Sequence, residues 1–117
     1  MRCRAELGRA RQYGPLTICA PVYVELRAYP GVSQELASTF LNSTGIIVDY
    51  SIDEDVWIET AARFAKYAAR RRKSGGGSPK RMLADFFVGS HALLKADRFL
   101  TLDQDRYLRD FPELKLL

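Results

Sequence analysis

The sequence predicts a three-layer α/β/α sandwich with a mostly parallel sheet. Helical segments alternate with short strands through the 117 residues of the chain. The strands are almost wholly apolar, as in LTIC at 16–19 and GIIVD at 45–49, which is typical of strands buried on both faces of a parallel sheet. A composition that is 47% hydrophobic and 27% charged fits one globular domain over residues 1–117.

The first half of the chain predicts the order helix, strand, helix, helix, strand. Residues 1–12 are good helix formers, and a glycine and a proline follow them before the strand at 16–19. Pro21 suits the first turn of a helix over 21–28. Ser33 can cap a helix that runs through Leu41, and the β-branched strand at 45–49 follows.

The second half predicts two long helices and two short strands. Ser51 and Glu54 have the spacing of a capping box, so the longest helix is expected over about 52–72. Three glycines make 73–78 a loop, and a helix over about 82–96 comes after it. Apolar runs predict strands at 99–102 and 114–117, with a short helix over 105–110 between them.

Composition excludes several classes of protein. Cys3 and Cys19 are far apart and the chain has one histidine, so neither a zinc site nor a disulfide framework is expected. No apolar run approaches the roughly 18 residues of a membrane span, and the N-terminus lacks the apolar region of a signal peptide. We therefore expect a soluble, cytoplasmic protein without a membrane partner. Its net charge of +4 favours polyanions modestly.

Three carboxylates are expected at one edge of the predicted sheet. Glu25 follows the first strand, Asp103 directly follows the strand at 99–102, and Asp85 opens a helix that leads back to the same edge. Ligands bind outside the carboxyl ends of the strands in such sheets. Converging carboxylates are costly unless they share a cation, and oxygen ligands select Mg²⁺ or Mn²⁺. Hydrolysis of a phosphodiester is the most common chemistry of such a site.

Each acid also has a purely structural explanation. Glu25 could be a solvated helix residue, Asp85 could complement the helix dipole, and Asp103 could form a turn. Apolar neighbours follow Asp85 directly, in the segment FFV at 86–88, so its carboxylate needs a partner.

A basic cluster flanks the glycine loop and precedes Asp85. It could track the phosphates of an RNA, or it could be a solvated helix end whose cations complement the dipole. Arg27 could also meet a phosphate or one of the acids. His91 comes six residues after Asp85, so we expect it on another helix face, in the core or an interface. The residues of the cluster are Arg70, Arg71, Arg72, Lys73, Lys80 and Arg81.

Two stretches of the chain resemble a known family. The segment PKRMLADFFVGSHALLKADRFLTLDQDRYLRDFPELKLL looks like the C-terminal half of a PIN domain, in particular of VapC-like toxins from type II toxin-antitoxin pairs. Its strongest motifs are the A-D-F-x-x-G-x-H-A helix and the L-T-x-D strand end. The segment LTICAPVYVEL resembles the second strand of the family and the helix that carries its glutamate. The resemblance extends from about residue 5 onward.

The resemblance implies a Mg²⁺- or Mn²⁺-dependent endoribonuclease, expected as a homodimer and silenced by a VapB-like antitoxin. The antitoxin is expected to lie across apolar grooves and to block the acidic cleft with a basic side chain. Glu25, Asp85 and Asp103 match the metal-binding acids of the family. Thr101 matches the small hydroxyl residue two before the last acid, and Asp105 would supply an outer carboxylate.

The sequence departs from the family at its N-terminus. The family begins with a strand that ends in an aspartate ligand, whereas the only acid before Glu25 is Glu6, in a predicted helix. We therefore expect an N-terminally truncated PIN fold, from an internal start in a longer reading frame or from decay of a toxin. A second hypothesis is a catalytically impaired PIN remnant that binds an antitoxin or dimerises. A third, an unrelated α/β ligand-binding domain, requires Asp85 and Asp103 to lie far apart.

Overall fold

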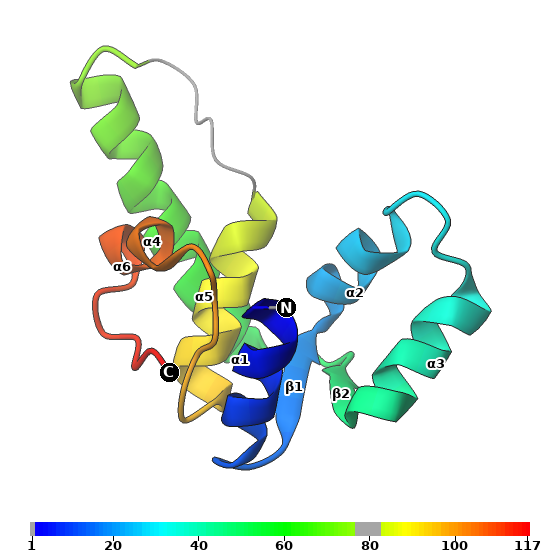
Figure 1. The fold of residues 1–117 in the computed structure, drawn as a ribbon. Coiled ribbons are helices and arrows are strands. Elements are labelled where there is room, and N and C mark those ends of the chain that lie inside the picture. The colour runs from blue at the N-terminus through cyan, green and yellow to red at the C-terminus, as the bar shows by residue number, and fades with distance from the viewer. Residues whose placement is uncertain (1, 77–82) are drawn as a thin grey trace. The chain divides into compact units, whose positions relative to one another are not determined.

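The computed structural model describes residues 2–76 and 83–117. This part of the chain forms six helices and a two-stranded parallel sheet, so the predicted mixed α/β class is confirmed (Figure 1). The residues group into two compact units, Met1–Ser51 and Ile52–Leu117. None of the described helices has both the length and the apolar character that a membrane span requires.

The N-terminal unit contains three helices and both strands. Its elements in chain order are α1 Arg2–Arg11, β1 Leu16–Cys19, α2 Ala20–Arg27, α3 Gln34–Thr44 and β2 Ile46–Asp49. The strands are parallel, with Leu16 opposite Ile46 and Cys19 opposite Asp49. Both strands therefore end at the same edge, and α2 and α3 form the connection between them (Figure 1).

Local signals in the sequence explain where these helices begin and end. Pro21 stands in the first turn of α2, where its missing N–H leaves no helical hydrogen bond unmade. Ser33 caps α3 as predicted, since its side chain accepts a hydrogen bond of 3.0 Å from the backbone N–H of Leu36. Gly45 ends α3 with a φ of 71°, so the helix runs three residues beyond the predicted Leu41.

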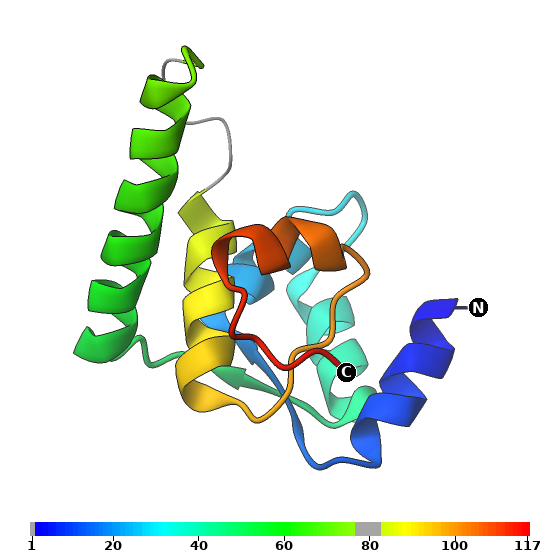
Figure 2. The same cartoon turned by 90° about the vertical axis from the view of Figure 1, so that its left-hand side faces the viewer.

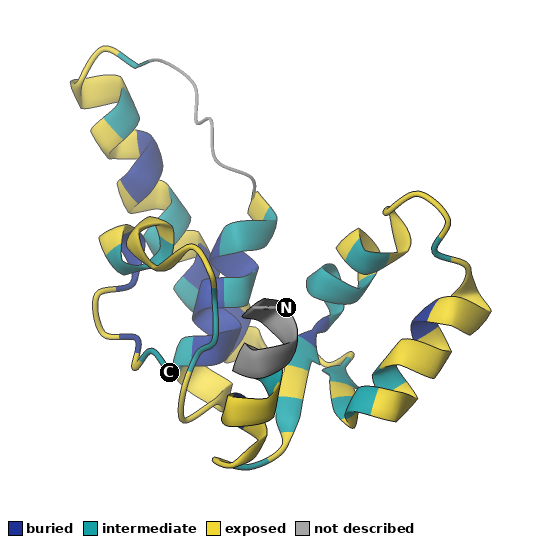
Figure 3. Cartoon of the chain, viewed as in Figure 1, coloured by how far each residue is buried: buried dark blue, intermediate teal, exposed yellow. Residues whose placement is uncertain are grey.

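The C-terminal unit is built on two helices that pack side by side, α4 and α5 (Figures 1 and 2). Its elements are α4 Glu54–Lys73, α5 Leu83–Lys95 and α6 Gln104–Asp110. Buried residues concentrate on α5, which is apolar on most of its faces (Figure 3). The buried residues of α5 are Phe86, Phe87, Gly89, Ser90, His91 and Ala92.

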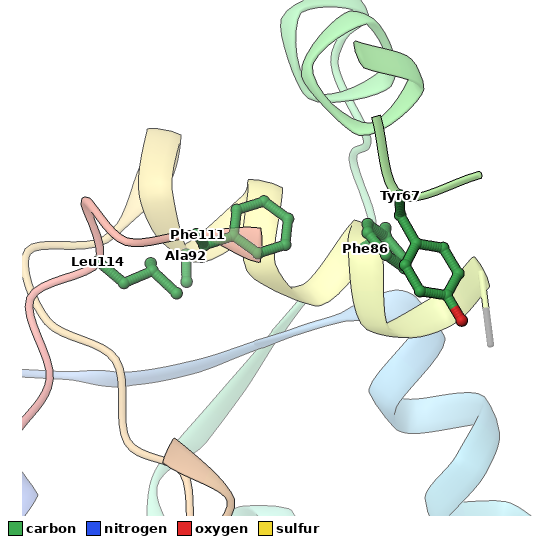
Figure 4. Packing of buried hydrophobic residues seen from close by; sticks show 5 residues of the cluster. All are labelled: Tyr67, Phe86, Ala92, Phe111 and Leu114. Atoms are coloured by element: carbon green, nitrogen blue, oxygen red, sulfur yellow. The ribbon is translucent and has the colours of Figure 1, made fainter. Parts of the chain in front are cut away.

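Aromatic rings fill the core of the C-terminal unit (Figure 4). The side chains of Phe86 and Phe111 are fully buried, and the ring centroids of Tyr67 and Phe86 lie 5.4 Å apart. Burial of one such side chain contributes about 1.5–3 kcal/mol to stability. The cluster joins α4, α5 and the segment after α6, with Ala92 and Leu114 as its remaining buried members.

Arg63 fastens α4 to the C-terminal segment. Its guanidinium donates two hydrogen bonds to the Glu113 carboxylate, at 2.9 and 2.8 Å, and one of 2.9 Å to the backbone oxygen of Asp110. The same group pairs with Glu59 at 2.7 Å and lies over the Phe111 ring, 5.1 Å from its centroid. Arg63 therefore covers the core as well as pairing charges.

The predicted capping box at the start of the longest helix is wrong. The helix begins at Glu54 with Asp53 in the capping position, and the side chain of Asp53 makes no capping bond. The backbone N–H of Ser51 instead donates a hydrogen bond of 2.9 Å to the Asp49 carboxylate. Lys95 pairs with Asp53 at 3.0 Å and with Asp55 at 3.1 Å, which ties this end of α4 to the end of α5.

The two strands predicted near the C-terminus are also wrong as strands. They meet only at one parallel bridge, Phe99 with Leu116. The backbone N–H of Phe99 donates to the oxygen of Lys115 at 2.8 Å, and the N–H of Leu117 donates to the oxygen of Phe99 at 3.0 Å. The Thr101 hydroxyl accepts a hydrogen bond of 3.1 Å from the backbone N–H of Asp103.

Candidate functional site

Glu25, the first of the predicted acids, lies near the edge of the two-stranded sheet at which both strands end. β1 ends at Cys19 and β2 ends at Asp49, opposite one another. Glu25 stands on α2 with an exposed side chain. Burial raises the pKa of the Cys19 thiol, and the negative charges of Glu25 and Asp49 act in the same direction. The edge therefore carries two nearby carboxylates rather than one.

Asp49 is a second acid at this edge that the sequence reasoning did not consider. It is the last residue of β2, much as Asp103 comes directly after the apolar run at 99–102, so the same rule identifies it. The Asp49 side chain is half-buried, and its carboxylate accepts a hydrogen bond from the backbone N–H of Ser51. The sequence therefore contains the signal for this acid, at the end of the apolar run 45–49.

Asp85 and Asp103 are brought together by an arginine. The Arg106 guanidinium donates a hydrogen bond of 2.5 Å from its Nη2 to Oδ2 of Asp85. Its Nη1 lies 3.7 Å from Oδ2 of Asp103. The two carboxylates, 18 positions apart in the sequence, are therefore held within the span of one guanidinium group.

Local structure explains how each of these side chains is placed. Asp85 lies in the first turn of α5, and its side chain is only 15% exposed. Asp103 directly precedes the first residue of α6, and its backbone N–H donates a hydrogen bond to the Thr101 hydroxyl. The side chain of Asp103 is 58% exposed. Arg106 comes three residues later, so it lies on the same end of α6 as Asp103.

The predicted set of acids is divided between the two units. Glu25 belongs to the N-terminal unit, whereas Asp85, Asp103 and the exposed Asp105 belong to the C-terminal one. Over residues 2–76 and 83–117 no three side chains of histidine, cysteine, aspartate or glutamate gather closely enough to hold a metal ion. Two carboxylates with waters nevertheless suit Mg²⁺, which often takes one or two protein carboxylates and leaves further positions to water or phosphate. In the described structure these two carboxylates are paired with the Arg106 guanidinium.

The basic cluster at the end of α4 is only partly available to a ligand. Arg70 pairs with the buried Asp110, and Arg71 donates to the backbone oxygen of Gly76. Arg72 and Lys73 are exposed. The remaining members of the cluster, Lys80 and Arg81, lie outside the described residues.

The other predicted residues have less specific surroundings. Arg27 is exposed on α2, and its guanidinium lies 3.5 Å from the hydroxyl of Tyr23. His91 is 7% exposed on α5, which confirms that it is a core residue. A cavity of about 260 Å³ borders the end of α5 and the C-terminal segment, and none of the predicted acids lines it.

Comparison with known proteins adds no relative to this description. No family model, no curated protein and no solved structure matches the chain.

Proposed function

We propose that the protein is a Mg²⁺- or Mn²⁺-dependent endoribonuclease of the PIN and VapC type, the toxin of a pair with a VapB-like antitoxin. The proposal rests on the motif resemblance. The single structural observation that supports it is the contact of both Asp85 and Asp103 with Arg106.

That contact matters because it bears on the alternative of an unrelated ligand-binding domain. Such a domain has no reason to draw these two acids to one point, and it would be favoured if they lay far apart. A single guanidinium reaches both, so their proximity supports a shared cation site. The resemblance assigns the same two residues to metal binding.

Asp85 and Asp103 would hold the metal, with Asp105 as an outer carboxylate, and the resemblance assigns Glu25 as a further ligand. The metal, when bound, lowers the pKa of a water and neutralises charge on the phosphodiester. The Thr101 hydroxyl fixes the backbone at Asp103 through the hydrogen bond that it accepts.

The exposed end of α4 would hold the RNA backbone. Arg72 and Lys73 extend the positive charge of the α4 C-terminus into solvent, where phosphates can approach. In this proposal the domain is a PIN-like three-layer sandwich that works as a cytoplasmic homodimer, and Arg27, Arg71, Lys80 and Arg81 complete the RNA-binding set.

The experiment is cleavage of a structured RNA by the full chain in Mn²⁺, with EDTA as the metal-free control. Asp85→Asn keeps the size of the side chain and removes the charge, so cleavage should fall by about a hundredfold or more. Asp97→Asn is the matched control, an exposed acid two residues after α5. Equal cleavage by the wild type and Asp85→Asn would refute the assignment.

A second candidate function is an antitoxin-binding or dimerisation module without activity. Exposed apolar side chains on α2 and α3 favour it, since Val24 is 66% exposed, Leu36 52% and Phe40 42%. Such surfaces commonly bind partners. A chain that forms a stable complex or dimer yet leaves RNA intact in Mn²⁺ would support this function over the first.

A further inference from the structure

α4 has an exposed apolar side, opposite the side that packs into the core of the C-terminal unit. The buried residues of this helix are Val56, Thr60, Tyr67 and Ala68. A surface helix usually carries polar residues on its other side, yet Ile58 on that side is 62% exposed. Residues three, four and seven positions apart share one face of a helix, so the exposed apolar residues form one continuous surface. We call this surface the outer face of α4, and its members are Ile58, Ala61, Ala62, Ala65 and Ala69.

Charges of opposite sign stand at the two ends of the outer face. Glu54 and Asp55 are the first two residues of α4, and Arg72 and Lys73 are the last two. Glu54 and Arg72 are 18 positions apart, which is five full turns at 3.6 residues per turn, so both lie along one edge of the face. Asp55 and Lys73 have the same spacing along the other edge, and all four residues are exposed. The outer face is therefore acidic at one end, apolar in the middle and basic at the other end.

This order of charges makes the outer face complementary to a second copy of itself. When two α4 helices lie antiparallel, Glu54 of each copy comes beside Arg72 of the other, and Asp55 comes beside Lys73. A two-fold axis relates these contacts, as it does in the interfaces of most homodimers. Parallel packing would instead bring acid against acid and base against base, which is costly. The charges thus select both the occupant of the face and its direction.

We propose that the outer face of α4 is the interface of a homodimer in which two α4 helices pack antiparallel. The small alanine side chains let two helices approach at the short end of the usual range of about 8–10 Å between axes. Ile58 of one copy then lies across from Ala69 of the other. The inference rests on the homodimer in the proposed function, whose interface it identifies, and not on nuclease activity.

The basic end of the outer face would then have two uses. Arg72 and Lys73 are the exposed cations assigned to RNA in the proposed function, and in the dimer they pair with acids of the second copy. RNA and the second copy would therefore compete for these charges. For this reason the test of the interface omits RNA.

The first test is the mass of the full chain in sedimentation equilibrium at low salt, without RNA or added metal. The wild type should reach twice the 13.3 kDa of one chain as its concentration rises. Ala65→Glu places like charges on both copies close to the two-fold axis, so it should raise the dimer dissociation constant at least about tenfold. Ala96→Glu is the matched control, an exposed alanine directly after α5, and should dimerise like the wild type. Circular dichroism verifies that each variant is folded.

The second test reverses the charges at one edge of the face. Glu54→Arg or Arg72→Glu alone should raise the dissociation constant about threefold to tenfold, and the double variant should return it close to the wild-type value. Asp55 is a poorer choice because it pairs with Lys95 of its own chain at 3.1 Å. Glu35→Arg makes the same change in net charge as Glu54→Arg, on the exposed surface of α3, and serves as the control.

The outcomes separate the interface from the rest of the proposed function. A wild type that stays monomeric up to about 100 μM, a range that includes weak dimers, would refute the inference. If the wild type dimerises and Ala65→Glu does so equally well, the dimer uses another surface and this interface is refuted. Single reversals that weaken the dimer without recovery in the double variant would refute the antiparallel arrangement. Weakening in Ala65→Glu and in both reversals, with recovery in the double variant, supports the inference, and RNA cleavage in Mn²⁺ tests the nuclease independently.

Discussion

Gly89 is the residue at which the core of the C-terminal unit leaves least room. A Cβ atom added there would lie 2.4 Å from the ring of Phe111, whose side chain is fully buried and cannot swing into solvent. Gly89→Ala should therefore lower the free energy of unfolding by about 1–3 kcal/mol, the usual cost of overpacking. Urea denaturation followed by circular dichroism measures it. Gly8→Ala is the control, because a Cβ at Gly8 meets no atom within 4 Å, and it should not destabilise the protein.

Glu113 gives the stability a dependence on acid pH. The hydrogen bond from Arg63 lowers the pKa of Glu113 from its ordinary 4.5 to about 2. Stability from this pair is thus fully present above pH 4.5 and is lost as the pH falls toward 2. The effect is below about 1 kcal/mol because the side chain is half-exposed.

The difference between the wild type and Glu113→Gln isolates this effect from other titrating acids. The advantage of the wild type in free energy of unfolding should shrink between pH 4.5 and pH 2. Urea titrations at several pH values measure it. A difference that stays constant over this range would mean that the pair with Arg63 does not stabilise the folded state.

Asp85 shows what the sequence can and cannot predict about a single residue. The apolar neighbours of Asp85 correctly predicted that its carboxylate needs a partner, since burial of an unpaired charge is costly. They could not identify Arg106, which lies 21 residues away and whose approach depends on the packing of α6. The local pattern thus predicts the need for a partner, and the tertiary structure supplies it.

At the scale of elements, the caps of α3 contribute measurable stability. Ser33→Ala removes the hydrogen bond to the N–H of Leu36 and should cost about 1 kcal/mol. Ser33→Asp keeps an oxygen acceptor at the same position and should retain most of the stability. Thermal denaturation of the three proteins checks this, and equal melting temperatures would contradict the capping role.

The elements that were predicted correctly are those whose signals are local. Pro21, Ser33 and Gly45 each act on the turn that they occupy, and the helices that they bound are present. The strands near the C-terminus depended instead on finding partners. The apolar runs at 99–102 and 114–117 meet at one bridge, Phe99 with Leu116, and neither forms a regular strand.

At the scale of the molecule, the basic end of α4 should govern RNA binding in the proposed function. Replacing both Arg72 and Lys73 with glutamine removes two exposed charges and should weaken RNA binding at low salt. The slope of log affinity against log salt should become shallower by about 1.4 for single-stranded RNA. Fluorescence anisotropy over a series of salt concentrations measures it. A slope that does not change would exclude this surface from contact with RNA.

The sequence predicts the direction in which the two strands pair but not the number of strands in the sheet. Parallel pairing of β1 with β2 agrees with the almost wholly apolar strands that predicted it. The extent of the sheet could not be predicted, because strand order depends on contacts between segments far apart in the chain. The grouping of the predicted acids could not be predicted for the same reason, since Glu25 belongs to one unit and Asp85 to the other.

The central claim is that Asp85 and Asp103 serve a metal-dependent nuclease site. Its most direct test is the single-turnover rate of RNA cleavage in Mn²⁺ by the wild type, Asp85→Asn and Asp103→Asn. Cleavage by the wild type and a loss of about a hundredfold or more in both variants is the predicted result. A wild type that leaves RNA intact, or an Asp103→Asn variant as fast as the wild type, would contradict it.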